Sequence, residues 1–210
     1  MTVELALLLI GAYLLGAIPF GVLVARSKGV DLMSVGSGNT GATNVMRALG
    51  KGPGYMVFAL DLLKGLIPAL VARWLLPDRQ ELWMLAGFVA VLGHSFSPFL
   101  KFKGGKGISS ALGMAIGTSP PVAFSAFGLF ILLLAVTRYM SLSSMVAVAS
   151  TIAFCFVFKD SHWVTAGFVL LTVFVVYRHR ANIKRLKDGT EPKFKLGKTI
   201  NTPSGKQDAP

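Results

Sequence analysis

The distribution of apolar residues constrains this chain more than any single motif does. Apolar stretches cover most of the 210 residues, and only 14% of the residues are charged, whereas a water-soluble domain has about 25%. Because about 20 apolar helical residues cross the ~30 Å hydrocarbon core of a bilayer, these stretches predict membrane-spanning helices. We therefore expect an all-α fold, a polytopic membrane bundle of seven transmembrane helices. Their expected ranges are 3–24, 53–76, 81–100, 108–119, 121–137, 143–158 and 161–177.

The basic residues indicate how such a bundle is oriented in the membrane. Seventeen of the 21 lysines and arginines fall in the connections on one side or in the C-terminal segment, whereas the opposite connections contain only Arg79 and Lys159. Because Lys and Arg are enriched in cytoplasmic loops, we expect the N-terminus outside and the C-terminus in the cytoplasm. With its basic residues at this interface, the net charge of +12 favours anionic lipid headgroups or small anionic substrates as partners, and no nucleic acid.

The domain organisation follows from the same pattern. We expect one transmembrane domain over residues 1–200 and a disordered tail over residues 201–210. The range 108–119 is short for a crossing, so it either lies in a thinned part of the bilayer or dips in beside a re-entrant loop. Within the spans, Asp61 and Lys64 lie three residues apart on one helical face and can pair. A structural pair and a direct functional role both remain open.

Three polar segments on the predicted cytoplasmic side are too rich in glycine and polar side chains to be simple connectors. The first is GSGNTGATNVMR, residues 36–47. Its glycines permit positive φ, and successive N–H groups in such a turn form a concavity that binds anions. We expect Asn39 or Thr40 to cap a short helix that carries Thr40, Asn44 and Arg47 on one face. This arrangement suits a phosphate group, and the alternative is a glycine-rich turn with a capped surface helix.

The second segment is GHSFSPFLKFKGGKG, residues 93–107. Glycines on both sides of Lys106 leave its ammonium group on a stretch of backbone that offers only amides, as in phosphate-binding loops. This is not a Walker A loop, because Gly107 follows the lysine where Ser or Thr must bind magnesium. A basic juxtamembrane stretch would explain Lys101 and Lys103 but not the glycines, so we interpret the segment as a phosphate site.

The third segment is RHRANIKRL, residues 178–186, which follows the last span. If the helix continues through it, His179, Asn182 and Arg185 share one face. A basic flank of the kind that ends a membrane span would account for Arg178, Arg180, Lys184 and Lys187. Charge does not explain His179 and Asn182, so we predict that these two side chains bind substrate.

The residues on the predicted cytoplasmic side argue against several kinds of catalysis. The carboxylates there are Asp31, Asp188, Glu191 and Asp208, and none completes a convincing Ser/His/Asp or Cys/His arrangement. The three histidines are scattered and the one cysteine lies in an apolar stretch, so we expect no metal site and no cofactor. The remaining groups are anion binders, which suit a transfer from an already activated electrophile with phosphate as the leaving group.

The three segments resemble the motifs of the bacterial acyl-phosphate-dependent glycerol-3-phosphate acyltransferases, the PlsY family. They occur in the family's order and on the predicted side, and the expected spans cover nearly the whole chain. The resemblance implies a membrane acyltransferase of phospholipid biosynthesis in the bacterial inner membrane, with a cytoplasmic active site. Its partners would be acyl phosphate, glycerol 3-phosphate and the lipid bilayer, and its products lysophosphatidate and inorganic phosphate.

The resemblance also implies roles for individual residues. The implied catalytic residues are Ser37, Arg47, Lys106, His179 and Asn182. The implied substrate-binding or phosphate-binding residues are Gly38, Asn39, Thr43, Asn44, Gly104, Gly105, Gly107, Ser144 and Arg185. Because acyl phosphate is a mixed anhydride, we expect no covalent enzyme intermediate, and catalysis would depend on positioning and charge neutralisation.

Two other functions are compatible with parts of the pattern. A transporter or channel for a phosphorylated metabolite would suit short, glycine-interrupted spans and inward basic residues. Against it, the polar groups gather at one interface instead of the bilayer midplane, and the sequence has no internal repeat. A non-catalytic assembly factor is a weaker alternative, because such proteins rarely need three glycine-rich anion sites.

Overall fold

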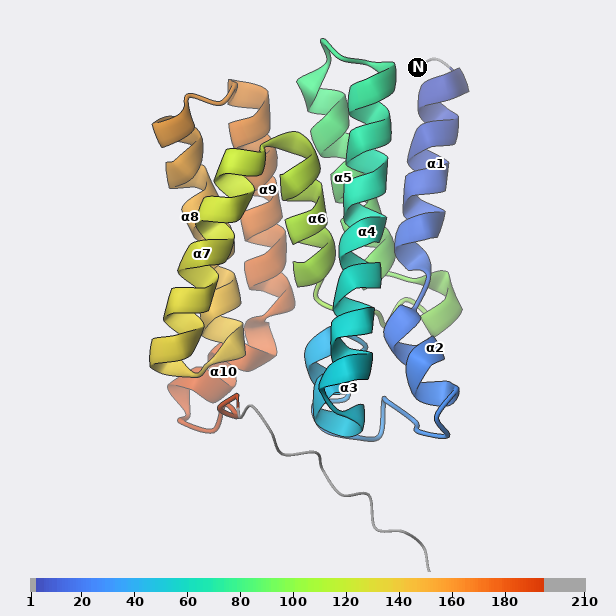
Figure 1. The fold of residues 1–210 in the computed structure, drawn as a ribbon, viewed down its shortest axis with the longest axis vertical. Helices are drawn as coiled ribbons and strands as arrows, with labels where there is room; N and C mark the ends of the chain where they lie inside the picture. The colour runs from blue at the N-terminus through green and yellow to red at the C-terminus, as the bar shows by residue number, and fades with distance from the viewer. Residues whose placement is uncertain (1–2, 195–210) are drawn as a thin grey trace, which may run out of the picture.

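The computed structural model describes residues 3–194, which form a bundle of roughly parallel and antiparallel helices (Figure 1). The tail predicted over residues 201–210 lies outside the described residues. The helices are α1 (Val3–Ala17), α2 (Phe20–Arg26), α3 (Ala42–Leu49), α4 (Lys51–Leu75), α5 (Gln80–Ser95), α6 (Ile108–Thr118), α7 (Pro120–Thr137), α8 (Met140–Phe158), α9 (His162–Arg178) and α10 (Arg180–Lys187). A short 3₁₀ turn, Pro98–Leu100, follows α5.

Each predicted span coincides with a helix or a pair of consecutive helices. Five segments within the described part of the chain are long and apolar enough to cross a membrane, and the bent pair α9 and α10 would make six. Helix α6, with 11 residues, is too short for a full crossing of ~30 Å at 1.5 Å per residue. The structure therefore confirms an all-α, multi-pass membrane bundle, while the count of seven and the orientation stay predictions.

Proline interrupts the first span. The sequence pattern predicts one helix over residues 3–24, but α1 ends at Ala17 and α2 begins at Phe20. Pro19 lies between them, and its ring disfavours helical backbone at the preceding residue, Ile18. The break offsets α2 from α1 at the end of the bundle that also carries α3 and α10 (Figure 1).

Glycines allow the central helices to approach closely. A Cβ added at Gly113 of α6 would overlap the backbone of Leu62 in α4, and one added at Gly65 would overlap the backbone of Ser110. Gly16 of α1 meets Ala90 of α5 in the same way. Close backbone contact at small residues is the usual basis of helix association in a bilayer, where lipid removes the hydrophobic driving force.

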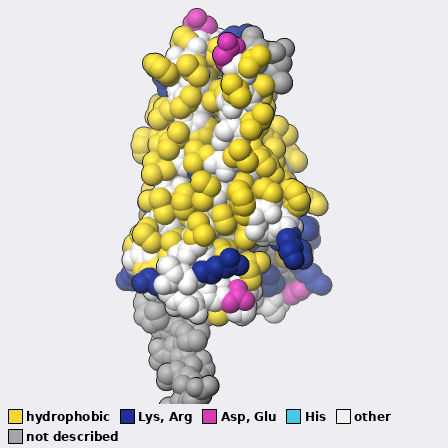
Figure 2. Space-filling model, turned by 90° about the vertical axis from the view of Figure 1, so that its right-hand side faces the viewer, with side chains coloured by type: hydrophobic (Ala, Val, Ile, Leu, Met, Phe, Trp, Pro, Cys, Tyr) yellow, Lys and Arg dark blue, Asp and Glu magenta, His cyan; other side chains and the backbone are white. Residues whose placement is uncertain are grey.

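The outer surface matches a membrane environment. Hydrophobic side chains cover most of the height of the molecule, and Lys and Arg gather near one end (Figure 2). Exposed apolar residues include Leu7, Ile10, Leu70, Phe124 and Leu132. The basic end is the one that carries α3, α10 and the loop before α6, so all three polar segments of the sequence lie there (Figure 1).

Candidate functional site

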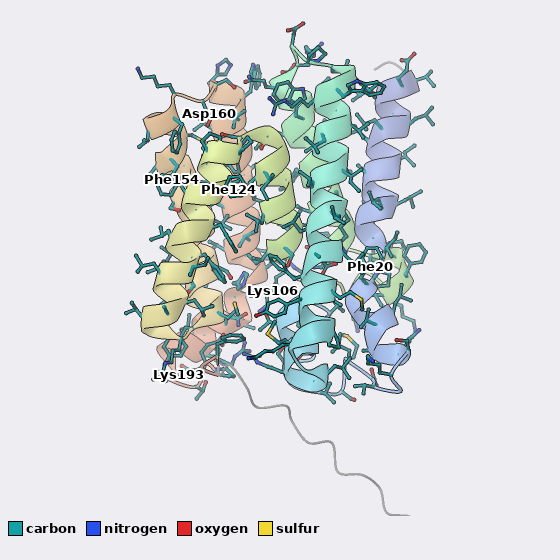
Figure 3. The ribbon with its side chains drawn as sticks, viewed as in Figure 1. Phe20, Lys106, Phe124, Phe154, Asp160 and Lys193 are labelled. Atoms are coloured by element: carbon teal, nitrogen blue, oxygen red, sulfur yellow. The ribbon has the colours of Figure 1, made fainter. Side chains whose placement is uncertain are left out.

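The loop that precedes α6 presents Lys106 near the basic end of the bundle (Figure 3). The amide N–H of Gly104 donates to the Ser95 carbonyl and that of Gly105 to the His94 carbonyl, both at 3.1 Å. A Cβ at Gly105 would overlap the His94 ring, so this position requires glycine. These two amides are therefore engaged within the protein, and the donors left to a ligand are the Lys106 ammonium group and the first turn of α6.

Lys106 belongs to a hydrogen-bonded network that joins distant parts of the chain. Its Nζ donates to Oδ1 of Asn182 in α10 at 2.6 Å, and Nδ2 of Asn182 donates to Oε1 of Glu191 at 2.7 Å. Ser141 Oγ of α8 donates to the same Oε1 at 2.6 Å, and Arg185 Nε donates to Oε2 at 2.8 Å. The network fixes the position of Asn182 relative to Lys106, and it confirms that Asn182 and Arg185 share a face of α10.

Glu191 lies at the centre of this network, although the sequence pattern gave no reason to choose it. Burial raises the pKa of its carboxyl group, but hydrogen bonds from Ser141, Asn182 and Arg185 outweigh burial and hold the pKa below its ordinary value. Glu191 is therefore ionised and balances part of the surrounding positive charge. Its position depends on a turn after α10 in which the N–H groups of Thr190 and Glu191 both donate to the Arg185 carbonyl, and spacing alone does not reveal that turn.

The site carries an excess of positive charge. Burial lowers the pKa of Lys106 to about 8, with Glu191 opposing the shift and Arg185, Arg47 and Arg178 adding to it. Burial also lowers the pKa of the Arg47 guanidinium, which interacts electrostatically with Glu191 and Arg185. Several cations thus face one carboxylate, an arrangement that favours a phosphate dianion.

The first polar segment differs from the prediction in its cap and in one proposed ligand. Helix α3 begins at Ala42 after Gly41, and no side chain caps it, so the prediction that Asn39 or Thr40 would do so was wrong. Thr40 precedes the helix and cannot share its face with Asn44 and Arg47.

Asn44 supports the loop that precedes α3. It is buried, its Oδ1 accepts from the Ser37 amide at 2.9 Å, and its Nδ2 donates to the Leu32 and Val35 carbonyls at 3.1 Å. These bonds use both of its N–H groups, which leaves none for a substrate.

The other residues of this segment reach the site to different degrees. The charge of Arg47 interacts with those of Glu191 and Arg185, two members of the Lys106 network. Ser37 is exposed and Thr43 half-buried, and within residues 3–194 no side-chain hydrogen bond joins either of them to that network. Asn39 Oδ1 accepts from the Gly41 amide at 3.1 Å, and Gly38 has φ +61° in the turn, so both shape the loop.

The chain bends by 60° between α9 and α10, and the break falls at His179. The helix therefore does not continue through this segment, so the condition for a shared face fails for His179, while Asn182 and Arg185 both lie in α10. The His179 ring is buried, and its Nδ1 lies 2.8 Å from the Val175 carbonyl oxygen.

Arg178, which we interpreted as part of a basic flank, instead contacts the loop before α6. Arg180, Lys184 and Lys187 are exposed, as a flank requires.

An apolar cavity adjoins the site. It has about 550 Å³ of space not filled by atoms, including the part open to the outside. Ser144 lies on its wall, and its Oγ donates to the Met140 carbonyl at 2.8 Å, so Ser141 and not Ser144 reaches the Glu191 network. Other residues that line the cavity are Phe58, Ile108, Ala111, Phe127, Ala147 and Phe168.

The predicted pair of Asp61 and Lys64 forms, with 2.7 Å between Oδ1 and Nζ. Both side chains are buried, and Lys64 Nζ also donates to the Ile18 carbonyl at 3.0 Å, at the break between α1 and α2. His94 Nδ1 lies 3.7 Å from Asp61 Oδ1. The pair joins α4 to the break in the first span, which supports its structural interpretation.

The fold is that of an integral multi-pass membrane protein, and its candidate site gathers cationic groups beside an apolar cavity. A profile of the glycerol-3-phosphate acyltransferase family matches residues 6–189, and the chain belongs to this family. The protein is accordingly a membrane acyltransferase of phospholipid synthesis that acts on glycerol 3-phosphate.

Relatives and solved structures agree along nearly the whole chain. The glycerol-3-phosphate acyltransferase of Geotalea daltonii is 47% identical over 196 residues, which are 93% of this chain and all of the relative. That of Aquifex aeolicus is 47% identical over 189 residues, 89% of this chain and 97% of the relative.

Two crystal structures of the integral membrane enzyme PlsY are similar. The glycerol 3-phosphate form has a TM-score of 0.88 at 45% identity, covering 91% of this chain and 96% of its own. The lysophosphatidic acid form has a TM-score of 0.87 at 44% identity, covering 92% and 96%.

Proposed function

We propose that the enzyme transfers a fatty acyl group from acyl phosphate to the 1-hydroxyl of sn-glycerol 3-phosphate. The products are lysophosphatidate and inorganic phosphate. The observation that carries this proposal is the half-buried, cationic Lys106 beside an apolar cavity, because the donor has a phosphate attached directly to a fatty acyl carbonyl. The similar PlsY structures, one a glycerol 3-phosphate form and the other a lysophosphatidic acid form, support the acceptor and the lipid product.

Lys106 and the first-turn amides of α6 hold the phosphate of the donor in this mechanism. The acceptor hydroxyl oxygen attacks the acyl carbonyl carbon, and the bond from that carbon to the phosphate oxygen breaks. Phosphate leaves with the bonding electrons, and the lysine charge and helix amides stabilise it as it departs. Because the anhydride is already activated, no covalent enzyme intermediate forms.

Arg47, Ser37, His179 and Asn182 hold glycerol 3-phosphate beside the donor. Arg47 supplies a guanidinium for its phosphate, and Asn182 is already oriented by Glu191. The phosphate dianion of glycerol 3-phosphate takes the proton of the attacking hydroxyl, since the side chains in hydrogen-bond contact with Lys106 include no free base within the described chain.

The membrane arrangement follows from the same proposal. The fatty chain lies in the apolar cavity between α4, α6, α7, α8 and α9, which it enters sideways from the lipid. The enzyme spans the bacterial inner membrane seven times, with α6 as a short span, the N-terminus outside and the active site on the cytoplasmic side.

Phosphate release tests the proposed reaction. Purified enzyme is given palmitoyl phosphate and glycerol 3-phosphate, and Lys106→Ala is compared with Lys103→Ala, which removes an exposed lysine from the same loop. We expect release that needs both substrates, drops at least about 100-fold in Lys106→Ala, and stays near wild type in Lys103→Ala. Release without glycerol 3-phosphate, or equal activity in the two variants, would contradict the proposal.

A further inference from the structure

Arg178 makes contacts that its place in a basic flank does not explain. It is the last residue of α9, it is half-buried, and its Nη2 points back into the bundle. Nη2 donates to the carbonyl oxygens of Gly105 at 2.9 Å, Gly104 at 3.0 Å and Ser95 at 3.4 Å. The guanidinium carbon also lies 5.2 Å from the centre of the Phe96 ring, within the range of a cation–π contact.

Arg178 holds this loop through its carbonyl groups, whereas the end of α5 holds it through its amide groups. The amides of Gly104 and Gly105 already bind the carbonyls at the end of α5, so one side of this backbone is fixed. Gly104 is half-buried and Gly105 is buried, and within residues 3–194 neither carbonyl has another protein donor, so the guanidinium satisfies both. Because glycines have no side chains to restrict their backbone, these two depend on such hydrogen bonds to limit their conformation.

The same chain segment also contacts the lysine that follows these glycines. Arg178 binds Gly105, the residue directly before Lys106, while Asn182, four residues after Arg178, accepts from Lys106 Nζ. Arg178 thus holds the backbone directly before Lys106, and Asn182 orients the end of the Lys106 side chain. Both come from the junction of α9 and α10, so one junction sets the position of the lysine.

We propose that Arg178 is a positioning residue for acyl transfer, which holds the Gly104–Gly105 backbone so that Lys106 points at the donor phosphate. The proposal rests on the function proposed for Lys106 and adds to it a residue that touches neither substrate. It depends on the planar guanidinium, whose Nη2 donates to the carbonyls while its face lies over the Phe96 ring, because a compact ammonium group cannot make both contacts at once.

Two measurements on Arg178→Gln, Arg178→Lys and Arg180→Gln test the proposal. Arg180 is the matched control, since it carries the same charge two residues away, is exposed, and stacks on Tyr177 instead of the loop. The first measurement is hydrogen exchange of the backbone amides of residues 103–107 in the detergent-purified protein, which does not depend on activity. The second is the separate KM and kcat for palmitoyl phosphate and for glycerol 3-phosphate.

We expect Arg178→Gln to speed exchange of the Gly104 and Gly105 amides about tenfold or more, since charged hydrogen bonds to this backbone are lost. Its kcat/KM for palmitoyl phosphate falls by a similar factor while KM for glycerol 3-phosphate changes little. Arg178→Lys recovers part of both properties, and Arg180→Gln matches wild type. Unchanged exchange in Arg178→Gln, or equal losses in the Arg180 control, would overturn the proposal.

The same data separate this proposal from the proposed function. If wild type releases no phosphate, the proposed reaction fails while the exchange comparison still tests the role of Arg178. If Arg178→Gln does not fold, the exchange and kinetics of Arg178→Lys decide the question, because that variant keeps the charge. Wild-type exchange in Arg178→Lys would then contradict a role for the planar guanidinium.

Discussion

At the scale of single residues, the chemistry of the site depends on how Lys106 is surrounded. The sequence pattern shows a lysine between glycines, and the structure adds the carboxamide that orients it and the carboxylate that holds this carboxamide. Glu191 also limits how far burial and, to a lesser extent, the neighbouring arginines lower the pKa of Lys106. A lysine with a pKa of about 8 is still charged at neutral pH, so it can bind a phosphate while remaining sensitive to mild alkali.

The pKa of Lys106 leads to a prediction about pH. The ammonium group is charged below about pH 8 and neutral above it, so kcat/KM should fall as pH rises through about 8, approaching tenfold per unit. Measuring phosphate release from pH 6 to 9.5 tests this. Lys106→Arg, if active, should keep its activity at alkaline pH because the guanidinium stays charged.

His179 provides the control for this pH profile. We expect His179→Gln to lower activity at every pH without removing the fall in rate on either the acidic or the alkaline side of the pH profile, because the substrate phosphate serves as the base. If the substitution abolishes the acidic limb of kcat, the histidine and not the substrate accepts the proton.

At the scale of elements, breaks between helices place the functional groups as much as the helices do. The first span breaks at Pro19, and the last segment bends by 60° at His179. The second break turns Asn182 and Arg185 across the basic end of the bundle toward Glu191, whereas a straight helix would carry them away from it. The short helix α6 begins directly after the Lys106 loop, so its free N-terminal amides face the same site.

Close contact between α4 and α6 should be essential to the position of that loop. Gly113→Ala would place a methyl group against the backbone of Leu62, so we expect it to destabilise the protein by about 1–3 kcal/mol. Gly128 in α7 is the matched control, because a Cβ there meets no atom within 4 Å. Gly128→Ala should leave stability unchanged or raise it by about 0.5–1 kcal/mol. Thermal unfolding in detergent measures both, and equal midpoints would argue against this packing.

At the scale of the whole molecule, charge and hydrophobicity are separated along the bundle axis. Apolar side chains cover the middle, and the basic residues gather at the end toward which Lys106 lies (Figures 2 and 3). The apolar cavity is lined by residues of α4, α6, α7, α8 and α9, among them Ile108 at the start of α6. An enzyme that joins a water-soluble phosphate to a lipid acyl chain needs both environments in contact. The segregation provides this at the membrane surface.

The proposed orientation can be tested with single cysteines on the two ends. Native Cys155 is buried, so Lys103→Cys and Asp78→Cys each add one exposed thiol, at opposite ends of α5. In intact cells, a membrane-impermeant maleimide should label position 78 and leave position 103 unlabelled until the membrane is opened. The reverse pattern would place the active site outside.

The sequence by itself determined the apolar helices, the basic end and part of the candidate site. Hydropathy is a property of each stretch taken alone, so the expected ranges match the helices to within a few residues, apart from the break at Pro19. Lys106 stood out for the glycines on both sides of it, Asn182 because charge does not explain it, and Arg185 because helical spacing places it on the face of Asn182. The pairing of Asp61 with Lys64 followed from helical spacing, and the structure confirms it.

Only the tertiary structure decided how these groups meet. Glu191 joins the site through a turn after α10, Asn44 binds backbone carbonyls of a preceding loop, and Arg178 reaches glycines more than seventy positions earlier in the chain. Each of these roles depends on which backbone groups are left without a partner once the helices have packed. That outcome is set by contacts between segments distant in sequence, and the local pattern of residue types does not contain it.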